Sequence, residues 1–97
     1  MIVNERQTPK GLLVAVCDED VLGETFESDP VSLTVTEDFY GGKTVSESAV
    51  LDSFERATTA NIVGSRAVSL AIEEGFVNGN NVLDIDGTPH AQFLLLD

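Results

Sequence analysis

The order of apolar and polar residues predicts strands in the first part of the chain. Residues 1–7 and 11–17 are predicted to form two strands, and Pro9 and Gly11 favour a turn between them. The second segment is apolar on both faces, which is typical of a central strand. Residues 18–23 indicate a single helical turn. Residues 31–36 alternate regularly, which predicts a half-buried strand with Val31, Leu33 and Val35 facing inward.

Helical spacing begins after a predicted loop at residues 37–43. Thr44 and Glu47 match a capping box, and the helix that they start carries apolar residues at helical intervals. The pattern weakens over residues 58–61 and restarts at Gly64 for a second helix, which Gly75 closes, with Phe76 folding back onto its last turn. After a loop at residues 78–81, strands at 82–86 and 91–96 indicate a hairpin around Asp86 and Gly87.

The predicted order of elements is β-β-β-α-α-β-β. This order favours an α+β fold with a mostly antiparallel sheet of about five strands and two helices on one face. We expect residues 1–97 to form a single small domain, because this length suits one hydrophobic core.

The chain is strongly acidic, with 17 acidic and 5 basic residues among 97 and a net charge of −12. The acidic residues are spread along the sequence, which indicates a salt-adapted surface more than a specific site for one partner. No segment approaches a membrane span or the apolar core of a signal peptide, so we expect a cytoplasmic protein. A single cysteine, Cys17, rules out an internal disulfide and a cysteine-based zinc site.

Several short motifs resemble the archaeal family called domain of unknown function 424. They lie at residues 15–19, 22–23, 39–42, 60–64, 71–72, 81–83, 87 and 89–92. Their shared order along nearly the whole chain is more specific than any one motif. The resemblance implies an archaeal origin, a compact α+β fold and no established activity, and the acidic composition adds the expectation of a halophilic source. It supplies no catalytic residues.

Two enzymatic sites can be considered from the residues alone. Gly42, Lys43 and Thr44 match the end of a nucleotide-binding P-loop, but Glu37 stands where the first glycine belongs. Cys17 and His90, with Asp18 as an orienting carboxylate, could form a nucleophilic site. Cys17 is more simply a small hydrophobic residue at a strand end, where neighbouring acids raise the pKa of its thiol. We therefore lean toward a protein that is not an enzyme.

A metal site would need His90 together with Asp84 and Asp86, which share one strand face. These aspartates are more simply solvent-facing residues at a hairpin tip. We therefore predict neither a metal nor another cofactor.

The preferred hypothesis is a binding module with anion-binding loops at the starts of the two helices. Helix starts present free N–H groups, basic residues lie nearby, and an aromatic side chain could stack on a base. The candidate ligand-binding residues are Tyr40, Gly41, Gly42, Lys43, Asn61, Gly64, Ser65 and Arg66. The expected partner is RNA or a ribonucleoprotein. The alternatives are the enzyme centred on Cys17 and His90, and a protein–protein adaptor that uses an exposed sheet face or edge.

The net charge of −12 predicts that salt stabilises the fold. Repulsion between acidic residues is screened at molar salt, where the Debye length is about 3 Å. We expect the thermal midpoint, followed by circular dichroism, to rise as potassium chloride increases from dilute to molar. A flat or falling midpoint would contradict the salt-adapted interpretation.

Overall fold

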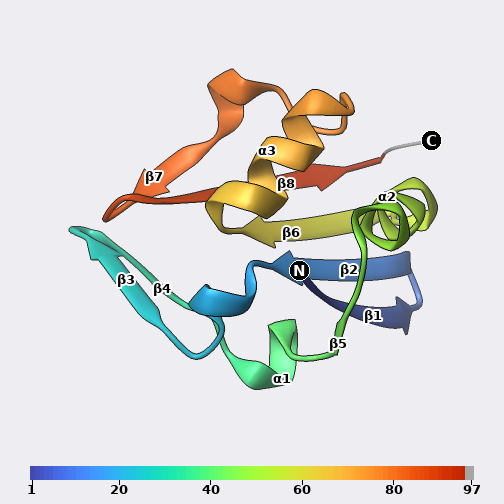
Figure 1. Cartoon of the computed structure of the whole chain (residues 1–97), viewed down its shortest axis with the longest axis horizontal. Helices are drawn as coiled ribbons and strands as arrows, with labels where there is room; N and C mark the ends of the chain where they lie inside the picture. Colours follow the sequence, from blue (N-terminus) through green and yellow to red (C-terminus); the bar gives the residue numbers. More distant parts are fainter. Residues whose placement is uncertain (96–97) are drawn as a thin grey trace.

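The sheet at the centre of the protein has six strands in the order β5-β1-β2-β6-β8-β7 (Figure 1). The computed structural model describes residues 1–95. The strands are β1 (Ile2–Thr8), β2 (Gly11–Cys17), β5 (Lys43–Thr44), β6 (Thr59–Val63), β7 (Leu83–Ile85) and β8 (Thr88–Leu94). β2 and β6 are parallel, and every other neighbouring pair is antiparallel. The predicted α+β class with a mostly antiparallel sheet is therefore confirmed.

The β1–β2 hairpin forms where the sequence predicts it, with Thr8 opposite Gly11. The Thr8 hydroxyl donates to the carbonyl of Gly11 at 2.7 Å and accepts from the amide of Lys10 at 3.2 Å. Gly11 has φ +119°, and a Cβ there would lie 2.1 Å from the hydroxyl oxygen of Thr58. Glycine is therefore required at the point where this turn meets the chain that leads into β6.

Strand β6 replaces the weak helical segment that the sequence indicates at residues 58–61. Its side chains alternate between two buried environments: Ala60 and Ile62 face one core and Val63 faces the other. β-branched and apolar residues at this spacing suit a strand buried on both faces. The sequence pattern does not reveal this strand, because it is only five residues long and lies between two stronger helical patterns.

Helices α2 (Glu47–Arg56) and α3 (Ser65–Glu73) cover one face of the sheet, as predicted. The opposite face is covered by the 3₁₀ turn η1 (Glu19–Val21), by α1 (Glu37–Tyr40) and by a separate ribbon of β3 (Thr25–Ser28) and β4 (Val31–Thr34). The ribbon projects at the left of Figure 1. Burial on both sides explains why β2 is apolar throughout.

Two expectations about the middle of the chain need correction. A strand does form within residues 31–36, as β4, but it is shorter than predicted. The strand predicted at residues 31–36 is not part of the main sheet: Val31 is 44% exposed, and only Val35, just past β4, is fully buried. The segment expected as a loop contains α1, which Thr36 caps by accepting from the amide of Phe39 at 3.3 Å. A polar outer face and a four-residue helix give little periodicity to detect.

The predicted capping box at the start of α2 is also wrong. Thr44 lies in β5, where it is opposite Ile2. Ser46 caps the helix instead, its hydroxyl accepting from the amide of Ala49 at 3.3 Å. Because Lys43 and Thr44 pair with β1 as β5, the helix begins two residues later than predicted.

The chain after α3 follows the sequence prediction, although the last strand, β8, begins at Thr88 and not at residue 91. Gly75, with φ +81°, follows α3, and the amide of Phe76 donates back to the carbonyl of Ala71 at 2.9 Å. The expected loop contains the short η2 (Gly79–Asn81). Asp86 (φ +52°) and Gly87 (φ +84°) form the two-residue hairpin turn, both with positive φ as in a type I′ turn. The end of the last predicted strand lies outside the described residues.

The start of α3 is capped by Asp18, which follows β2. Its two carboxylate oxygens accept from the amides of Arg66 and Ala67 at 2.9 and 2.8 Å. Gly64 has φ +113°, and a Cβ there would lie 2.4 Å from the carboxyl carbon of Asp18. The cap thus joins the end of β2 to the helix that follows β6. Among residues 1–95, no helix is long and apolar enough to cross a membrane.

This cap predicts a measurable loss of stability on mutation. Asp18→Ala removes both acceptors, and we expect the free energy of unfolding in urea to fall by about 1 to 2 kcal/mol. Asp20→Ala removes a neighbouring negative charge that, within residues 1–95, accepts no hydrogen bond from α3, so it should cost much less. Equal effects of the two variants would mean that charge, and not capping, explains the loss.

Candidate functional site

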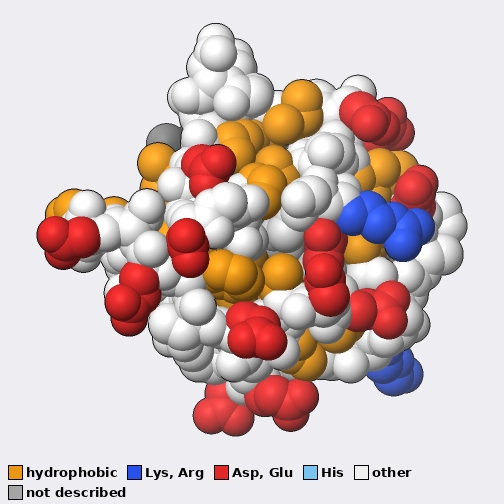
Figure 2. All heavy atoms as spheres, turned by 60° about the vertical axis from the view of Figure 1, so that its left-hand side comes forward, with side chains coloured by type: hydrophobic (Ala, Val, Ile, Leu, Met, Phe, Trp, Pro, Cys, Tyr) orange, Lys and Arg blue, Asp and Glu red, His pale blue; other side chains and the backbone are white. Residues whose placement is uncertain are grey.

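The basic residues are concentrated around one strand. Arg6 lies on β1, Lys10 in the turn that follows it, Lys43 on β5 beside it, and Arg56 at the end of α2. Only Arg66 of the five basic residues lies elsewhere, at the start of α3. Acidic side chains are spread over the face shown in Figure 2, with the basic groups at its right-hand side. Four of the five basic residues therefore lie on or beside β1.

Strand β1 is paired along its whole length on one side only. On the other side β5 pairs with Ile2 and Val3, and within residues 1–95 no strand continues that pairing along residues 5–8. The amide of Val45 donates to the carbonyl of Met1 at 2.9 Å, so that carbonyl points away from β2. Because strand residues alternate, Glu5 and Gln7 direct their N–H and C=O groups to the same open side.

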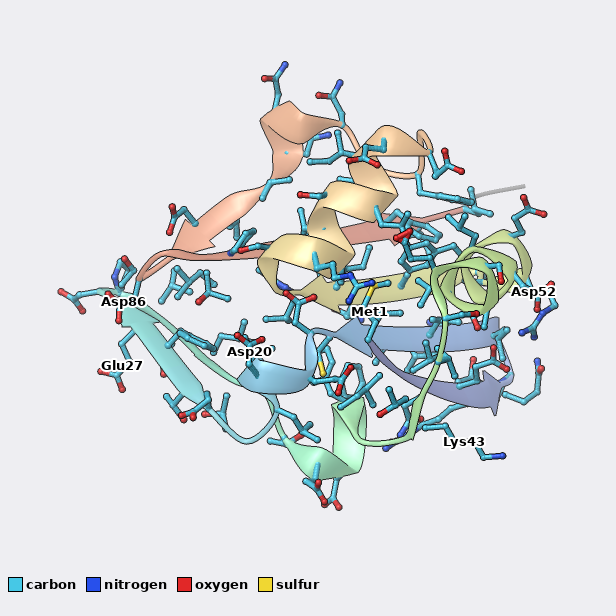
Figure 3. All side chains as sticks on the ribbon, viewed as in Figure 1. Met1, Asp20, Glu27, Lys43, Asp52 and Asp86 are labelled. Carbon is cyan, nitrogen blue, oxygen red and sulfur yellow. The ribbon has the colours of Figure 1, made fainter. Side chains whose placement is uncertain are left out.

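A cavity of about 470 Å³ lies beside this open edge, between β1, β5 and α2. Its lining combines apolar side chains with acidic and basic ones: Val3, Asn4, Glu5, Gly41, Gly42, Lys43, Val45, Ala49, Asp52, Ser53 and Arg56. Lys43 and Asp52 both lie at the right-hand end of the domain in Figure 3. The cavity therefore offers both signs of charge above an apolar wall.

A network of polar side chains fixes one side of the cavity. Both guanidinium nitrogens Nη1 and Nη2 of Arg56 donate to the carboxylate of Glu5, at 3.3 and 2.5 Å, and its Nε donates to Asp52 at 3.0 Å. The buried hydroxyl of Ser53 also donates to Glu5, at 2.5 Å. Hydrogen bonds from Arg56 and then Ser53 lower the pKa of Glu5. The stabilisation from this pair is present above the unfolded pKa of Glu5 and is lost as pH falls through its lowered folded value.

On the other face of β1, Arg6 lies over the ring of Phe39, with its guanidinium carbon 5.7 Å from the ring centroid. The side-chain amide of Asn4 donates to the carbonyl of Gly41 at 2.6 Å. A Cβ on Gly42 would lie 2.1 Å from the carbonyl oxygen of Val3, so glycine permits the close approach of this loop to β1. Both faces of the edge strand are therefore held in place.

The structure does not bring the two predicted anion loops together. Tyr40 is buried against Phe39, and burial raises the pKa of its hydroxyl to about 12, so its ring is not free to stack on a base. The amides at the start of α3 already donate to Asp18. Lys43 lines the large cavity, whereas Arg66 lines a smaller one of about 220 Å³ with Met1 and three acidic residues (Figure 3).

The remaining residues of the second loop have structural contacts of their own. Asn61 lies on β6, and its side-chain oxygen accepts from the side-chain Nε2 of Gln92 on β8. Gly64 is packed against Asp18, and Ser65 is the exposed first residue of α3. Of the proposed ligand-binding residues, only Gly41, Gly42 and Lys43 line the large cavity.

Cys17 and His90 are not in contact. The strand register places Val63 between them, Cys17 on one side and His90 on the other, so their backbones are about 10 Å apart. His90 donates from Nδ1 to the carbonyl of Ile62 at 3.0 Å. Cys17 is fully buried, and burial together with the charge of Asp18 raises the pKa of its thiol to about 11. The arrangement lacks the nucleophile–base contact that this chemistry requires.

Within residues 1–95, no group of three His, Cys, Asp or Glu side chains is placed to bind a metal ion. Asp84 accepts from the amide of Gly87 at 2.7 Å, and Asp86 occupies the turn itself. Both aspartates are exposed at the hairpin tip, as the simpler interpretation of the sequence has it.

Sequence reasoning missed most of the cavity. Asp52 and Arg56 carry a detectable signal, because acidic and basic residues four positions apart on a helix commonly pair. Glu5 and Ser53 are far apart in the sequence and meet only through packing. The open side of β1 depends on which strands pair, so it cannot be read from the residues of β1 alone.

Comparison with known proteins places the chain in one group. The model of the family described as "Protein of unknown function (DUF424)" matches residues 5–96. The crystal structure of an uncharacterized conserved protein from Methanopyrus kandleri is similar, with a TM-score of 0.80 and 26% sequence identity over 95% of this chain and 88% of the other. No curated protein matches the chain.

The burial of Cys17 predicts a slow thiol. We expect labelling by a thiol reagent at pH 8 to be at least about a hundredfold slower in the folded protein than in urea, because the reactive thiolate is disfavoured and the sulfur is inaccessible. The rate of colour release from a disulfide reagent measures this. Similar rates in the folded and unfolded states would restore Cys17 as a candidate nucleophile.

Proposed function

The chain belongs to the DUF424 family, and we propose that it is a binding module that takes an anionic ligand at the edge of its sheet. The proposed site, named here the β1 edge site, consists of the open side of residues 5–8, the adjoining cavity, and the basic side chains of Arg6, Lys10 and Lys43. No chemical step is assigned to it.

One observation carries the proposal: the open backbone groups of β1 lie beside a cavity, and three unpaired basic side chains lie along the same strand. Lys43 lines the cavity, Arg6 lies on the opposite face, and Lys10 lies in the turn after β1. Arg56 is paired with Glu5 and Asp52, whereas Arg6, Lys10 and Lys43 make no salt bridge within residues 1–95. In a chain of net charge −12, three unpaired cations around one strand give a local attraction for an anion.

RNA or a ribonucleoprotein is the ligand that the sequence favours, and its phosphates suit these cations. The burial of Tyr40 removes the stacking platform that this hypothesis included. RNA binding at this site would therefore rest on phosphate contacts with little base recognition. The acidic remainder of the surface supports the further proposal that the protein works in a salt-rich archaeal cytoplasm, where such contacts are weakened by screening.

The test is a titration of the ¹⁵N-labelled protein with a polyphosphate of about ten units as a generic polyanion. We expect amide shifts at residues 5–8 and 41–43. A triple variant with Arg6, Lys10 and Lys43 changed to Ala should bind roughly tenfold more weakly, since each exposed ion pair contributes about 0.2–1 kcal/mol.

Arg66→Ala is the matched control, because it removes one cation from the other cavity. It should leave the affinity unchanged. If Arg66→Ala weakens binding as much as the triple variant does, or if the shifts lie at the start of α3, the β1 edge site is not where the anion binds.

A further inference from the structure

We propose that the ligand of the β1 edge site is an extended segment of a different protein, which pairs antiparallel with residues 5–8 as an added strand. The segment carries a carboxylate where it faces Arg6 and apolar side chains where it faces the cavity. This inference rests on the proposed function and specifies the partner.

The backbone of β1 supplies the first requirement. Glu5 and Gln7 each point one N–H and one C=O to the open side, in line with the pairing that β5 makes with Val3. An added strand would continue the line of β5 and satisfy these four groups. Addition of a strand to a free edge is a common mode of peptide recognition, in which backbone bonds give affinity and alternate side chains give specificity.

The faces of β1 determine the side chains of the partner. Residues directly opposite each other in a sheet share a face. A partner residue opposite Arg6 lies on the α1 side, beside the guanidinium and Phe39, where a carboxylate is complementary in charge. Partner residues opposite Glu5 and Gln7 lie on the α2 side, next to the cavity whose apolar wall includes Val3, Val45 and Ala49.

A second copy of the chain fits this edge poorly. Two antiparallel copies of β1 related by a twofold axis must place residues of the same face opposite one another. Centring the pairing on Arg6 opposes two arginines, and centring it on Glu5 opposes two glutamates. Like charges directly opposite destabilise a strand pair. Centring on Gln7 brings Pro9 into the pairing, where it lacks an N–H.

RNA is also less complementary to this edge than a peptide. The open carbonyls of Glu5 and Gln7 require donors, whereas phosphate oxygens only accept. The carboxylates of Glu5 and Asp52 line the cavity and repel phosphate. A peptide strand supplies donors and acceptors in the alternation that the edge presents.

The first experiment titrates the full chain with an acetylated and amidated peptide, Thr-Glu-Val-Glu-Val-Thr. We expect shifts and slowed hydrogen exchange at the amides of Glu5 and Gln7, with little change at Arg6, whose amide already faces β2. Methylating the backbone nitrogens of both valines keeps every charge but removes two donors. This peptide should bind at least about tenfold more weakly. Equal binding of the two peptides would overturn strand addition.

Two variants test the same contacts from the protein side. Gln7→Pro removes one outward N–H without touching the β1–β2 bonds, whereas its control Gln7→Ala keeps that N–H. We expect only the proline variant to lose peptide affinity. Arg6→Glu gives a second test that does not depend on the folding of the proline variant. It should bind the acidic peptide more weakly and should bind more tightly a peptide in which lysines replace the glutamates. An unchanged preference would overturn the assigned contact.

An oligouridylate of twelve nucleotides separates this inference from the proposed function. If it binds the β1 edge site and the peptide does not, the partner is a nucleic acid, and the inference fails while the proposed function stands. If the peptide binds and the oligouridylate does not, the inference is supported. If neither the peptides nor polyphosphate bind at residues 5–8, both proposals fail.

Discussion

The rest of the structure depends on the parallel pairing of β2 with β6, which the carboxylate of Asp18 locks in place. Parallel strands need a crossover, and here the crossover contains the ribbon, α1, β5 and α2. Asp18 ends β2 and caps α3, while Gly64 leaves the space that the carboxylate fills. One acidic residue therefore fixes the register of the two central strands relative to the next helix. Its carboxylate also occupies the place at the start of α3 where an anion from solution could otherwise bind.

This central pair determines which strand becomes the edge. With β6 on one side of β2, β1 occupies the other side, and the two-residue β5 covers only its beginning. The crossover chain reaches the edge at Gly42, where it approaches the backbone of Val3, pairs with β1 as β5, and then continues into α2. The cavity lies where the crossover separates from the strand. The open edge and the cavity therefore follow from the same topological step.

The sequence predicts what local patterns encode. The β1–β2 hairpin, the turn at Asp86 and Gly87, and the close of α3 at Gly75 are set by residues within one turn of each other, and they lie where the pattern places them. Strand β6 and the cap at Asp18 depend on contacts between segments more than 40 positions apart. The candidate site is of this second kind. The sequence singles out Lys43, Gly41 and Gly42 as candidate binding residues because of their residue types. It does not predict that they lie beside the open side of β1.

The charges on β1 have two consequences that follow from one arrangement. Charged side chains on an edge strand disfavour pairing with a second copy of the same strand. In the registers centred on Glu5 and on Arg6, each of these residues lies opposite its own copy. The same Arg6 attracts an acidic partner, so exclusion of the self-pair and choice of partner use the same side chain. At molar salt the charge contribution is screened, but the backbone bonds at Glu5 and Gln7 and the apolar wall of the cavity are not. Affinity would then rest on hydrogen bonds and burial, while charge sets the register of the partner strand.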